Sequence, residues 1–378
     1  MYIGGKNMKK TFTKLLTLAL TMAMLSGCGG QASPSPSTAA ASAAVSETPA
    51  QTEAAASSEA SSEAGTRTVT DMAGRKVELP GEIDRIGTLG SVGVLNAFVE
   101  LMGSGDKIYN EMPASFTKND SWKMQYEFAP QIADGPLFES DNREVLIENI
   151  IQAAPDVCFT MTKDTAELLE NNNIPCIYLE WKDVEDVKTA VSLMGEVLNK
   201  EDMAEKYIVY FDEKMAKAQE LTKDLKDEDK VTVLYGNPVT FSQPHVIAEW
   251  WITQAGGMSV TNDGRSDNSL EYTMEDLLKW NPDVMIVSNA GLIDEMKANS
   301  NYSGITAVKN DAFHVIPTVA HVWGNRTVEQ PLTVFWTMHH LYPELMPREE
   351  LVKEIKYFYS EFFLYDVNDE QIDEMIGR

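Results

Sequence analysis

Cysteine and histidine are scarce in this sequence, with three and five occurrences in 378 residues. No pattern of the His-Glu-x-x-His kind is present, which argues against capture of a bare transition metal by a histidine cluster. Cys158 and Cys176 lie in or beside predicted strands. They are interpreted either as two buried thiols or as one disulfide, and the sequence leaves both open.

Basic residues are in the minority. The chain has 31 Lys and Arg against 58 Asp and Glu, which gives a net charge of −27. An acidic surface of this kind disfavours binding of nucleic acid or anionic lipid through charge, so no nucleic-acid partner is expected.

Motifs typical of enzymes are missing. There is no Gly-x-Ser-x-Gly elbow and no phosphate loop with Gly-Lys-Ser/Thr, and the glycines from Gly87 to Gly93 do not have dinucleotide spacing. No catalytic residue, resident metal or cofactor is therefore predicted. That glycine stretch does lead a strand into a helix, where backbone N–H groups at Ser91 either bind an anion or allow tight packing.

The N-terminus has the sequence pattern of a lipoprotein signal. Lysines flank the apolar run from Leu15 to Leu25, which is too short to span a membrane and ends in Ser26-Gly27-Cys28. We expect cleavage before Cys28 and lipid attachment to it. The following stretch to Gly65 consists almost entirely of Ser, Ala, Gln, Glu, Thr, Gly and Pro, which cannot offset the entropy of ordering and predicts a tether.

Strand and helix patterns then alternate. Residues 66–80 alternate apolar and polar residues around a turn and predict a β-hairpin. The strands that follow, among them Lys107–Tyr109, alternate with helices and predict parallel sheets covered by helices, an α/β fold. Residues 110–141 break the pattern as a long aromatic loop, and such loops usually cover something.

A long helix is predicted from Glu201 to Lys226, because apolar residues recur at intervals of three or four and neither Gly nor Pro occurs from Glu196 to Tyr235. Asn199 and Asp202 are expected to cap its start. The predicted organisation is a signal peptide (1–27), a tether (28–65), an N-terminal lobe (66–198), a bridging helix (199–228) and a C-terminal lobe with C-terminal helices (229–378).

The two halves share a motif, Glu-x6-Pro-Asp. It begins at Glu148 in the first half and at Glu275 in the second, and in each half a short helix stopped by Pro-Asp runs into a buried strand. Proline explains the end of the helix. The Glu gains only a few tenths of a kcal/mol from the helix dipole, so it is either a simple helix-start residue or a functional one.

Together these segments resemble a known family. Asp71-Met-Ala-Gly-Arg75, the paired Glu-x6-Pro-Asp motifs, Ala255-Gly256-Gly257 and Tyr342-Pro343-Glu344, behind a lipoprotein signal, resemble the substrate-binding proteins of ABC importers for iron-siderophores, haem and cobalamin. The resemblance implies two lobes with mainly parallel sheets, bridged by one long helix. It also implies that Glu148 and Glu275 pair with arginines of the permease.

The resemblance implies partners and a location too. They are an ABC permease with its ATPase, a small-molecule metal chelate as cargo rather than cofactor, and the outer face of the cell membrane or the periplasm through lipid on Cys28. We expect a monomer. An iron chelate of the ferric siderophore kind is favoured over a corrinoid, haem or a metal oxyanion, and an extracytoplasmic sensor or hydrolase is the alternative of another class.

Ligands of open parallel sheets bind beyond the carboxyl ends of the strands. Applied to the predicted strands, this rule gives Ser91, Tyr109, Trp181, Asn237, Phe241, Asn289, His321, Trp323 and Arg326.

Within that set, the loop with His321, Trp323 and Arg326 is the first choice, because it combines a stacking surface, a metal or hydrogen-bond ligand and a planar cation. The alternative for Arg326 is an ion pair with an acid such as Glu329.

Three further groups of residues are candidates. Of the adjacent Trp250 and Trp251, at most one can face the cleft, because neighbours on a helix point about 100° apart. His339 and His340 are interpreted as structural, since adjacent residues do not face each other on a helix. His245, at a helix start near the cleft, is left undecided.

Overall fold

The computed structural model describes residues 65–118, 120–265 and 269–377. The predicted signal peptide, Cys28 and nearly all of the tether lie outside the described residues. Within the part that is described, no helix combines the length and the apolarity needed to cross a membrane.

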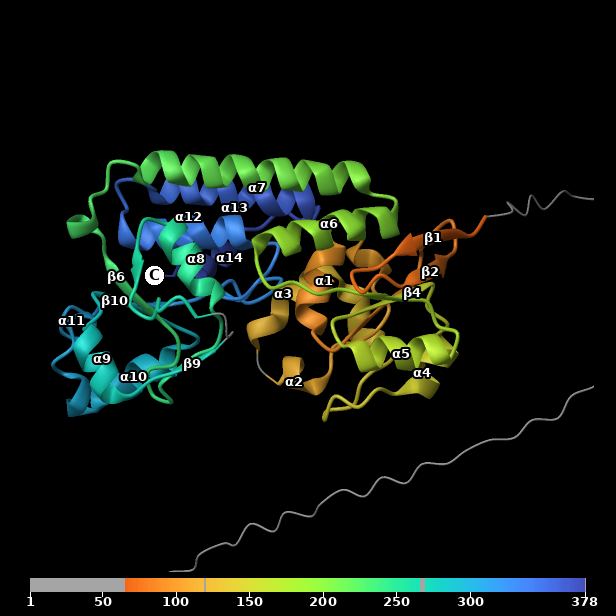
Figure 1. Cartoon of the computed structure of the whole chain (residues 1–378), viewed down its shortest axis with the longest axis horizontal. Coiled ribbons are helices and arrows are strands. Elements are labelled where there is room, and N and C mark those ends of the chain that lie inside the picture. Colours follow the sequence, from red (N-terminus) through yellow and green to blue (C-terminus); the bar gives the residue numbers. More distant parts are fainter. Residues whose placement is uncertain (1–64, 119, 266–268, 378) are drawn as a thin grey trace, which may run out of the picture. The chain divides into compact units, whose positions relative to one another are not determined.

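Short strands supply two parallel sheets and two small antiparallel pairs (Figure 1). The strands are β1 (Arg67–Thr70), β2 (Lys76–Leu79), β3 (Ile86–Leu89), β4 (Val157–Thr160), β5 (Cys176–Tyr178), β6 (Thr232–Tyr235), β7 (Ser242–Gln243), β8 (Met258–Ser259), β9 (Leu270–Glu271), β10 (Val284–Val287) and β11 (Phe313–Val315).

Helices connect these strands and form the C-terminal tail. They are α1 (Val92–Leu101), α2 (Ala114–Thr117), α3 (Lys123–Phe128), α4 (Ile147–Ala153), α5 (Lys163–Asn171), α6 (Val184–Leu198), α7 (Glu201–Thr222), α8 (Ile247–Gln254), α9 (Met274–Trp280), α10 (Ala290–Ala298), α11 (Thr306–Lys309), α12 (Gln330–Leu341), α13 (Arg348–Phe362) and α14 (Asp369–Ile376).

The parallel sheets confirm the predicted α/β class. One sheet has the order β3-β4-β5 and the other β11-β10-β6-β8, and every neighbouring pair in them is parallel. The central strands β4 and β10 have no exposed residue, as expected for strands covered on both faces. The predicted hairpin is also present, with β1 antiparallel to β2.

The shared Glu-x6-Pro-Asp motif has the same structure in both halves. Ala154 directly follows α4 and Asn281 directly follows α9, each with a left-handed backbone, and Pro-Asp then leads into β4 or β10. Asp156 Oδ2 accepts hydrogen bonds from the backbone N–H groups of Asp84 and Arg85, both at 2.8 Å. Its counterpart Asp283 accepts from Thr232, so each aspartate fixes the start of the neighbouring strand.

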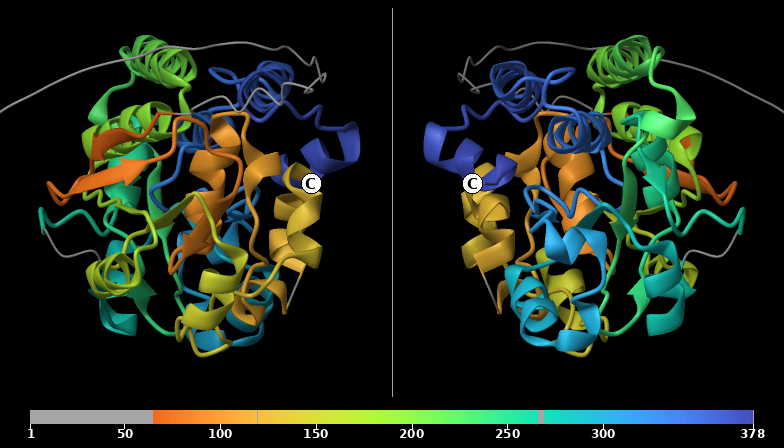
Figure 2. Two further views of the ribbon diagram at one scale, coloured as in Figure 1. Left: turned by 90° about the vertical axis from the view of Figure 1, so that its right-hand side faces the viewer. Right: turned by 90° about the vertical axis from the view of Figure 1, so that its left-hand side faces the viewer.

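Helix α7 carries the predicted apolar stripe on its inner face. Tyr207, Phe211 and Met215 are buried in it, and Tyr207 contacts Phe362 of α13 edge to face at 5.7 Å. The end-on views in Figure 2 show α7 and α13 side by side. The predicted cap was wrong, because Asn199 ends α6 in a left-handed conformation and Lys200 precedes α7 without a side-chain cap.

One predicted strand was wrong. Residues Gly105–Lys107 form a short 3-10 helix, and only Ile108 makes a bridge, to Ile86. The consequence is that Tyr109 lies beside the beginning of β3, where its N–H donates to the carbonyl of Ile86.

The two cysteines are neighbours in adjacent strands. Cys158 of β4 is in register with Cys176 of β5, and both are free buried thiols. Burial raises the pKa of the Cys176 thiol to about 12 and raises that of Cys158 well above its ordinary value. They are therefore protonated and unreactive at neutral pH.

Candidate functional site

A pocket of about 410 Å³ is lined by segments that lie on both sides of α7 in the sequence. One wall consists of residues 182–185, at the start of α6. The other wall consists of residues at the start and along one face of α8, together with Arg326 from the loop before α12. Its volume falls within the range typical of small-molecule sites.

Two cationic residues line this pocket, the exposed Lys182 and the buried Arg326. Only 8% of Arg326 is exposed, and burial lowers the pKa of its guanidinium, an effect opposed by the charges of Asp183 and Asp186. The side chain of Glu329, the acid considered as its partner from sequence, instead accepts hydrogen bonds from the backbone of Ala320 and His321. A buried guanidinium on a pocket wall suits a planar or anionic group.

Two imidazoles accompany Arg326. The pKa of His245 is lowered to about 4 by burial and by the charge of Arg326, and that of His321 to about 3 by burial and by His245. Both rings are therefore neutral at pH 7. Among the described residues neither Nδ1 atom has a hydrogen-bond partner. Both Nδ1 atoms are buried, and neither residue is among those that line the pocket.

Trp250 and Glu249 complete the wall from α8. Trp250 lines the pocket and stacks against Phe211 of α7 at 6.1 Å, whereas Trp251 is fully buried and contacts Tyr235. The expectation that at most one of the two tryptophans faces the cleft fits this geometry. The carboxylate of Glu249 is held by Thr261 at 2.7 Å and lies in an ion pair with a buried arginine, so it is a fixed part of the wall.

The long aromatic loop packs against His321, but none of its described residues lines the pocket. Trp122 packs its ring 5.4 Å from that of His321 and 4.9 Å from that of Phe116. Arg143, just after the loop, lies over Phe116 and donates to the carbonyl of Gly90, beyond the carboxyl end of β3. Their signal in the sequence was the unusual aromatic content of a long irregular segment.

Two predicted tryptophans pack into the core and do not line this pocket. Trp323 has no exposed surface and donates from Nε1 to Glu329 at 3.0 Å. Trp181 is 7% exposed and stacks on Phe98 of α1 at 4.7 Å. A position directly after a strand predicts the edge of the sheet at which a residue lies, but it does not predict where the side chain points.

Tyr109 and Ser91 also depart from the prediction. Tyr109 packs under Arg85, the residue before β3, and is therefore at the amino end of that strand. Ser91 begins α1 without a side-chain cap. The backbone N–H of the preceding residue, Gly90, donates to the buried carboxylate of Glu139 at 2.8 Å.

The remaining predicted positions make structural contacts and do not line the pocket. Asn237 Oδ1 accepts from the N–H groups of Val239 and Thr240. Asn289 caps α10, and Phe241 lies edge to face on Tyr272.

Glu148 and Glu275 occupy equivalent exposed places. Each lies in the first turn of a seven-residue helix, α4 or α9. Neither carboxylate has an ion-pair partner among the residues that the structure describes. Both are thus available to a partner of positive charge.

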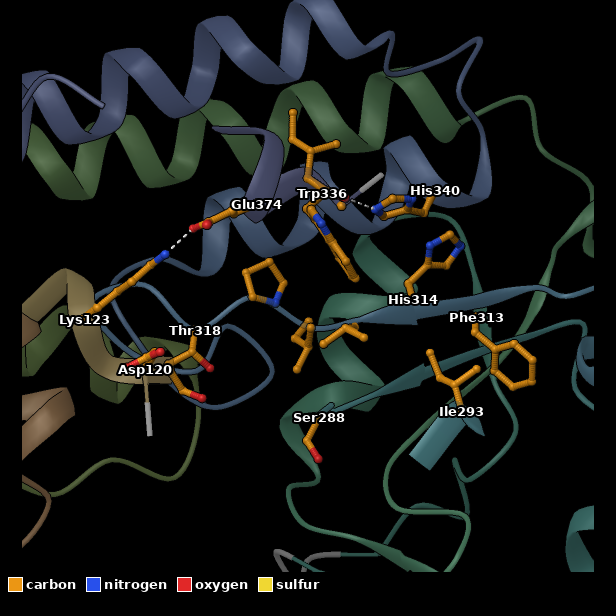
Figure 3. A pocket seen from close by; sticks show the side chains of 16 residues that line it. Asp120, Lys123, Ser288, Ile293, Phe313, His314, Thr318, Trp336, His340 and Glu374 are labelled. Atoms are coloured by element: carbon orange, nitrogen blue, oxygen red, sulfur yellow. Dashed lines mark hydrogen bonds and ion pairs between the residues drawn. The ribbon is translucent and has the colours of Figure 1, made fainter. Parts of the chain in front are cut away.

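A second cavity, of about 590 Å³, lies beside β11 and α12 (Figure 3). His314 stacks on His340 at 3.9 Å, and Trp336 meets His340 at 4.4 Å. His340 Nε2 donates to the carbonyl of Ile376, and the pKa of His340 is lowered to about 3 by burial and by the neighbouring histidines. Within the described ranges no group of three His, Cys, Asp or Glu side chains is arranged to hold a metal ion.

Solved structures share the fold. A periplasmic solute-binding protein of Veillonella parvula is 24% identical, with a TM-score of 0.72, 82% of this chain covered and 97% of that one. A molybdate periplasmic binding protein of Haemophilus influenzae, solved with molybdate, is 20% identical, with a TM-score of 0.69 and coverages of 80% and 99%. CeuE of Helicobacter pylori, in a nickel–histidine complex, is 15% identical, with a TM-score of 0.65 and coverages of 83% and 100%.

No curated protein matches the chain. Residues 116–320, more than half of the chain, match the sequence profile of the periplasmic binding protein family. That match agrees with the parallel sheets and with the structural neighbours. The chain is therefore a member of the periplasmic binding protein family.

Proposed function

We propose that the protein is the substrate-binding component of an ABC importer, attached to the outer face of the cell membrane through lipid on Cys28. The family match and the lipoprotein signal support this role. In this role the protein captures a small molecule outside the cytoplasm and presents it to a permease and its ATPase.

The cargo is an anionic iron chelate of the ferric siderophore kind. The observation that carries this assignment is the buried guanidinium of Arg326 on the pocket wall, in a chain with a net charge of −27. A chain so acidic repels anions in general, so a buried cation in a pocket is informative.

Replacing Arg326 by Gln tests the cargo. Loss of a buried charged partner costs roughly 2–5 kcal/mol, so the Kd for an anionic chelate should rise at least ~30-fold. Tryptophan fluorescence, titrated with ferric siderophores, haem, cobalamin and molybdate, measures this change. Arg348→Gln, at an exposed ion pair with Asp373, is the matched control and should leave the Kd unchanged.

Three outcomes contradict the assignment. Equal affinity of the wild type and Arg326→Gln for every anionic probe would remove Arg326 from the site. Turnover of a chelate without tight binding would favour the sensor or hydrolase class. A Soret band in the protein as isolated would replace the iron chelate by haem.

A metal oxyanion is the second candidate. The observation that favours it is the modest volume of the pocket, together with a relative of the same fold solved with molybdate. In the same titration, binding of molybdate without binding of any ferric chelate would select it.

Docking of the permease is assigned to Glu148 and Glu275. Their carboxylates are equivalent and exposed, one in each half, and neither is ion-paired within the part of the chain that the structure describes. They can meet two guanidinium groups as charge-assisted, bidentate hydrogen bonds. Contact at both carboxylates lets the permease sense the separation of the two halves.

A further inference from the structure

Each of the two docking carboxylates has an exposed aliphatic side chain close to it. Ile151 of α4 is 53% exposed and Leu278 of α9 is 46% exposed. Ile151 follows Glu148 by three residues, and Leu278 follows Glu275 by three residues. Single exposed apolar residues are ordinary on protein surfaces, but two at one position of an internal repeat are not scattered.

Packing inside the protein does not account for these side chains. In each helix the preceding residue, Ile150 or Leu277, is the one that enters the core, with no exposed surface. The next residue points about 100° away from it, outward. Folding would be satisfied by a polar residue at the position of Ile151 or Leu278. The next residue in each helix, Gln152 or Lys279, is also exposed and is polar.

The spacing places the acid and the aliphatic group on one helix face. Residues three apart in an α-helix are neighbours, with about 5–6 Å between their Cβ atoms. Figures 1 and 2 show α4 and α9 on the side of the folded unit remote from α7, so both faces are open to a partner. Each of the two helices therefore presents a carboxylate next to an exposed aliphatic side chain.

We propose that Ile151 and Leu278 are the apolar anchors of the permease interface. Resting on the proposed docking function, this inference specifies the partner surface as two contacts, each an arginine guanidinium beside an apolar hollow. The aliphatic side chain fills the hollow and excludes water from the adjoining ion pair, which strengthens that pair. The charge of the partner follows from the unpaired carboxylates and the apolar hollow from the two exposed side chains.

The test is binding to the permease–ATPase complex reconstituted in nanodiscs. The double variant Ile151→Ser with Leu278→Ser should bind about tenfold more weakly than the wild type, with cargo affinity unchanged. Because no charge is altered, the salt dependence of binding should stay as in the wild type. Val209→Ser, which removes a similarly exposed side chain from α7 (50%), is the control and should bind normally.

The variant Glu148→Gln with Glu275→Gln separates the two assignments. It should weaken binding and flatten the salt dependence, because it removes two charges. If this acidic variant binds weakly while Ile151→Ser with Leu278→Ser binds as tightly as Val209→Ser, only the apolar anchors are refuted. If the acidic variant itself binds normally, the docking function is refuted. Circular dichroism of each variant verifies that it is folded.

Discussion

Glu329 is a carboxylate with no exposed surface, and it organises the loop that carries Arg326. It accepts hydrogen bonds from the backbone N–H groups of Ala320 at 3.1 Å and His321 at 2.7 Å, and from Trp323 Nε1 at 3.0 Å. A buried carboxylate with several donors is costly to disturb, because each donor would lose its partner. The loop residues that face the pocket are therefore positioned from inside the core.

Glu100 of α1 lies close enough to be influenced by Glu329. It is 2% exposed, and its pKa is raised well above the ordinary value, first by burial and second by the charge of Glu329. Gln125 donates from Nε2 to Glu100 at 3.3 Å and to the carbonyl of Ala320 at 2.6 Å. Glu100 thus carries a proton in the folded protein at pH values where it has lost it in the unfolded chain.

This difference makes stability depend on pH. Below the unfolded pKa of about 4.3, Glu100 is protonated in both states and costs nothing. As the pH rises from there toward the raised folded pKa, folding must take up a proton, so the free energy of unfolding falls by up to about 1.4 kcal/mol per pH unit. Glu100→Gln removes this titration and should flatten the decline of Tm between pH 5 and 8.

Thermal unfolding across that pH range, followed by circular dichroism, measures the effect. Glu148→Gln, at an exposed carboxylate, is the control and should keep the wild-type slope. A Glu100→Gln protein with the same slope as the wild type would mean that Glu100 is ionised in the folded state.

Among the elements, α7 has the most direct mechanical role in the proposed function. Its 22 residues span about 33 Å. Tyr207 donates to the carbonyl of Val328, close to the loop with Arg326, and Phe211 stacks on Trp250 of the pocket. A stiff helix in this place limits how much the pocket and the two docking carboxylates can shift.

Glycine at exposed positions of α7 tests this role. Glu213→Gly with Gln219→Gly loosens the helix without removing a buried side chain, and should cost about 2 kcal/mol of stability relative to the same pair of alanines. Transport should fall more than cargo affinity. Denaturant unfolding, cargo titration and vesicle uptake measure the three quantities, and unchanged transport in the folded glycine variant would leave α7 as a connector only.

Element types followed from the sequence where periodicity was strong. The alternation of strands and helices, the hairpin and the stripe of α7 all appear in the structure. Helix α6 was not predicted, although Asp183 caps it through the N–H of Asp186 and its apolar spacing is helical. Lys107–Tyr109 failed as a strand because three alternating residues make too short a signal.

The site was predictable only in part, since burial depends on partners distant in sequence. Arg326 does line the pocket, and His321 lies within the influence of His245 beside it. Trp181 and Trp323 also follow strands, but both are buried in the core. Trp181 stacks on Phe98, and Trp323 donates a hydrogen bond to Glu329.

The net negative charge of the whole molecule disfavours nonspecific binding of anions. A net charge of −27 repels anionic lipid and most anions, and solubility benefits from the same repulsion. In the proposed function, productive contacts are therefore local, with a cation in the pocket for the cargo and two exposed carboxylates for the permease. This separation predicts that cargo capture and delivery can be disabled independently.

Replacing Glu148 and Glu275 together by Ala should abolish uptake and leave the Kd for the cargo unchanged, because neither residue lines the pocket. Each single variant retains one contact, so uptake should fall only in part. Glu213→Ala, at an exposed acid of α7, removes the same charge elsewhere and should transport normally. Uptake of radiolabelled cargo into vesicles, with cargo affinity measured in parallel, provides both readouts. Unimpaired uptake by the double variant would exclude these carboxylates as docking groups, and a loss of cargo affinity would place them in the binding site instead.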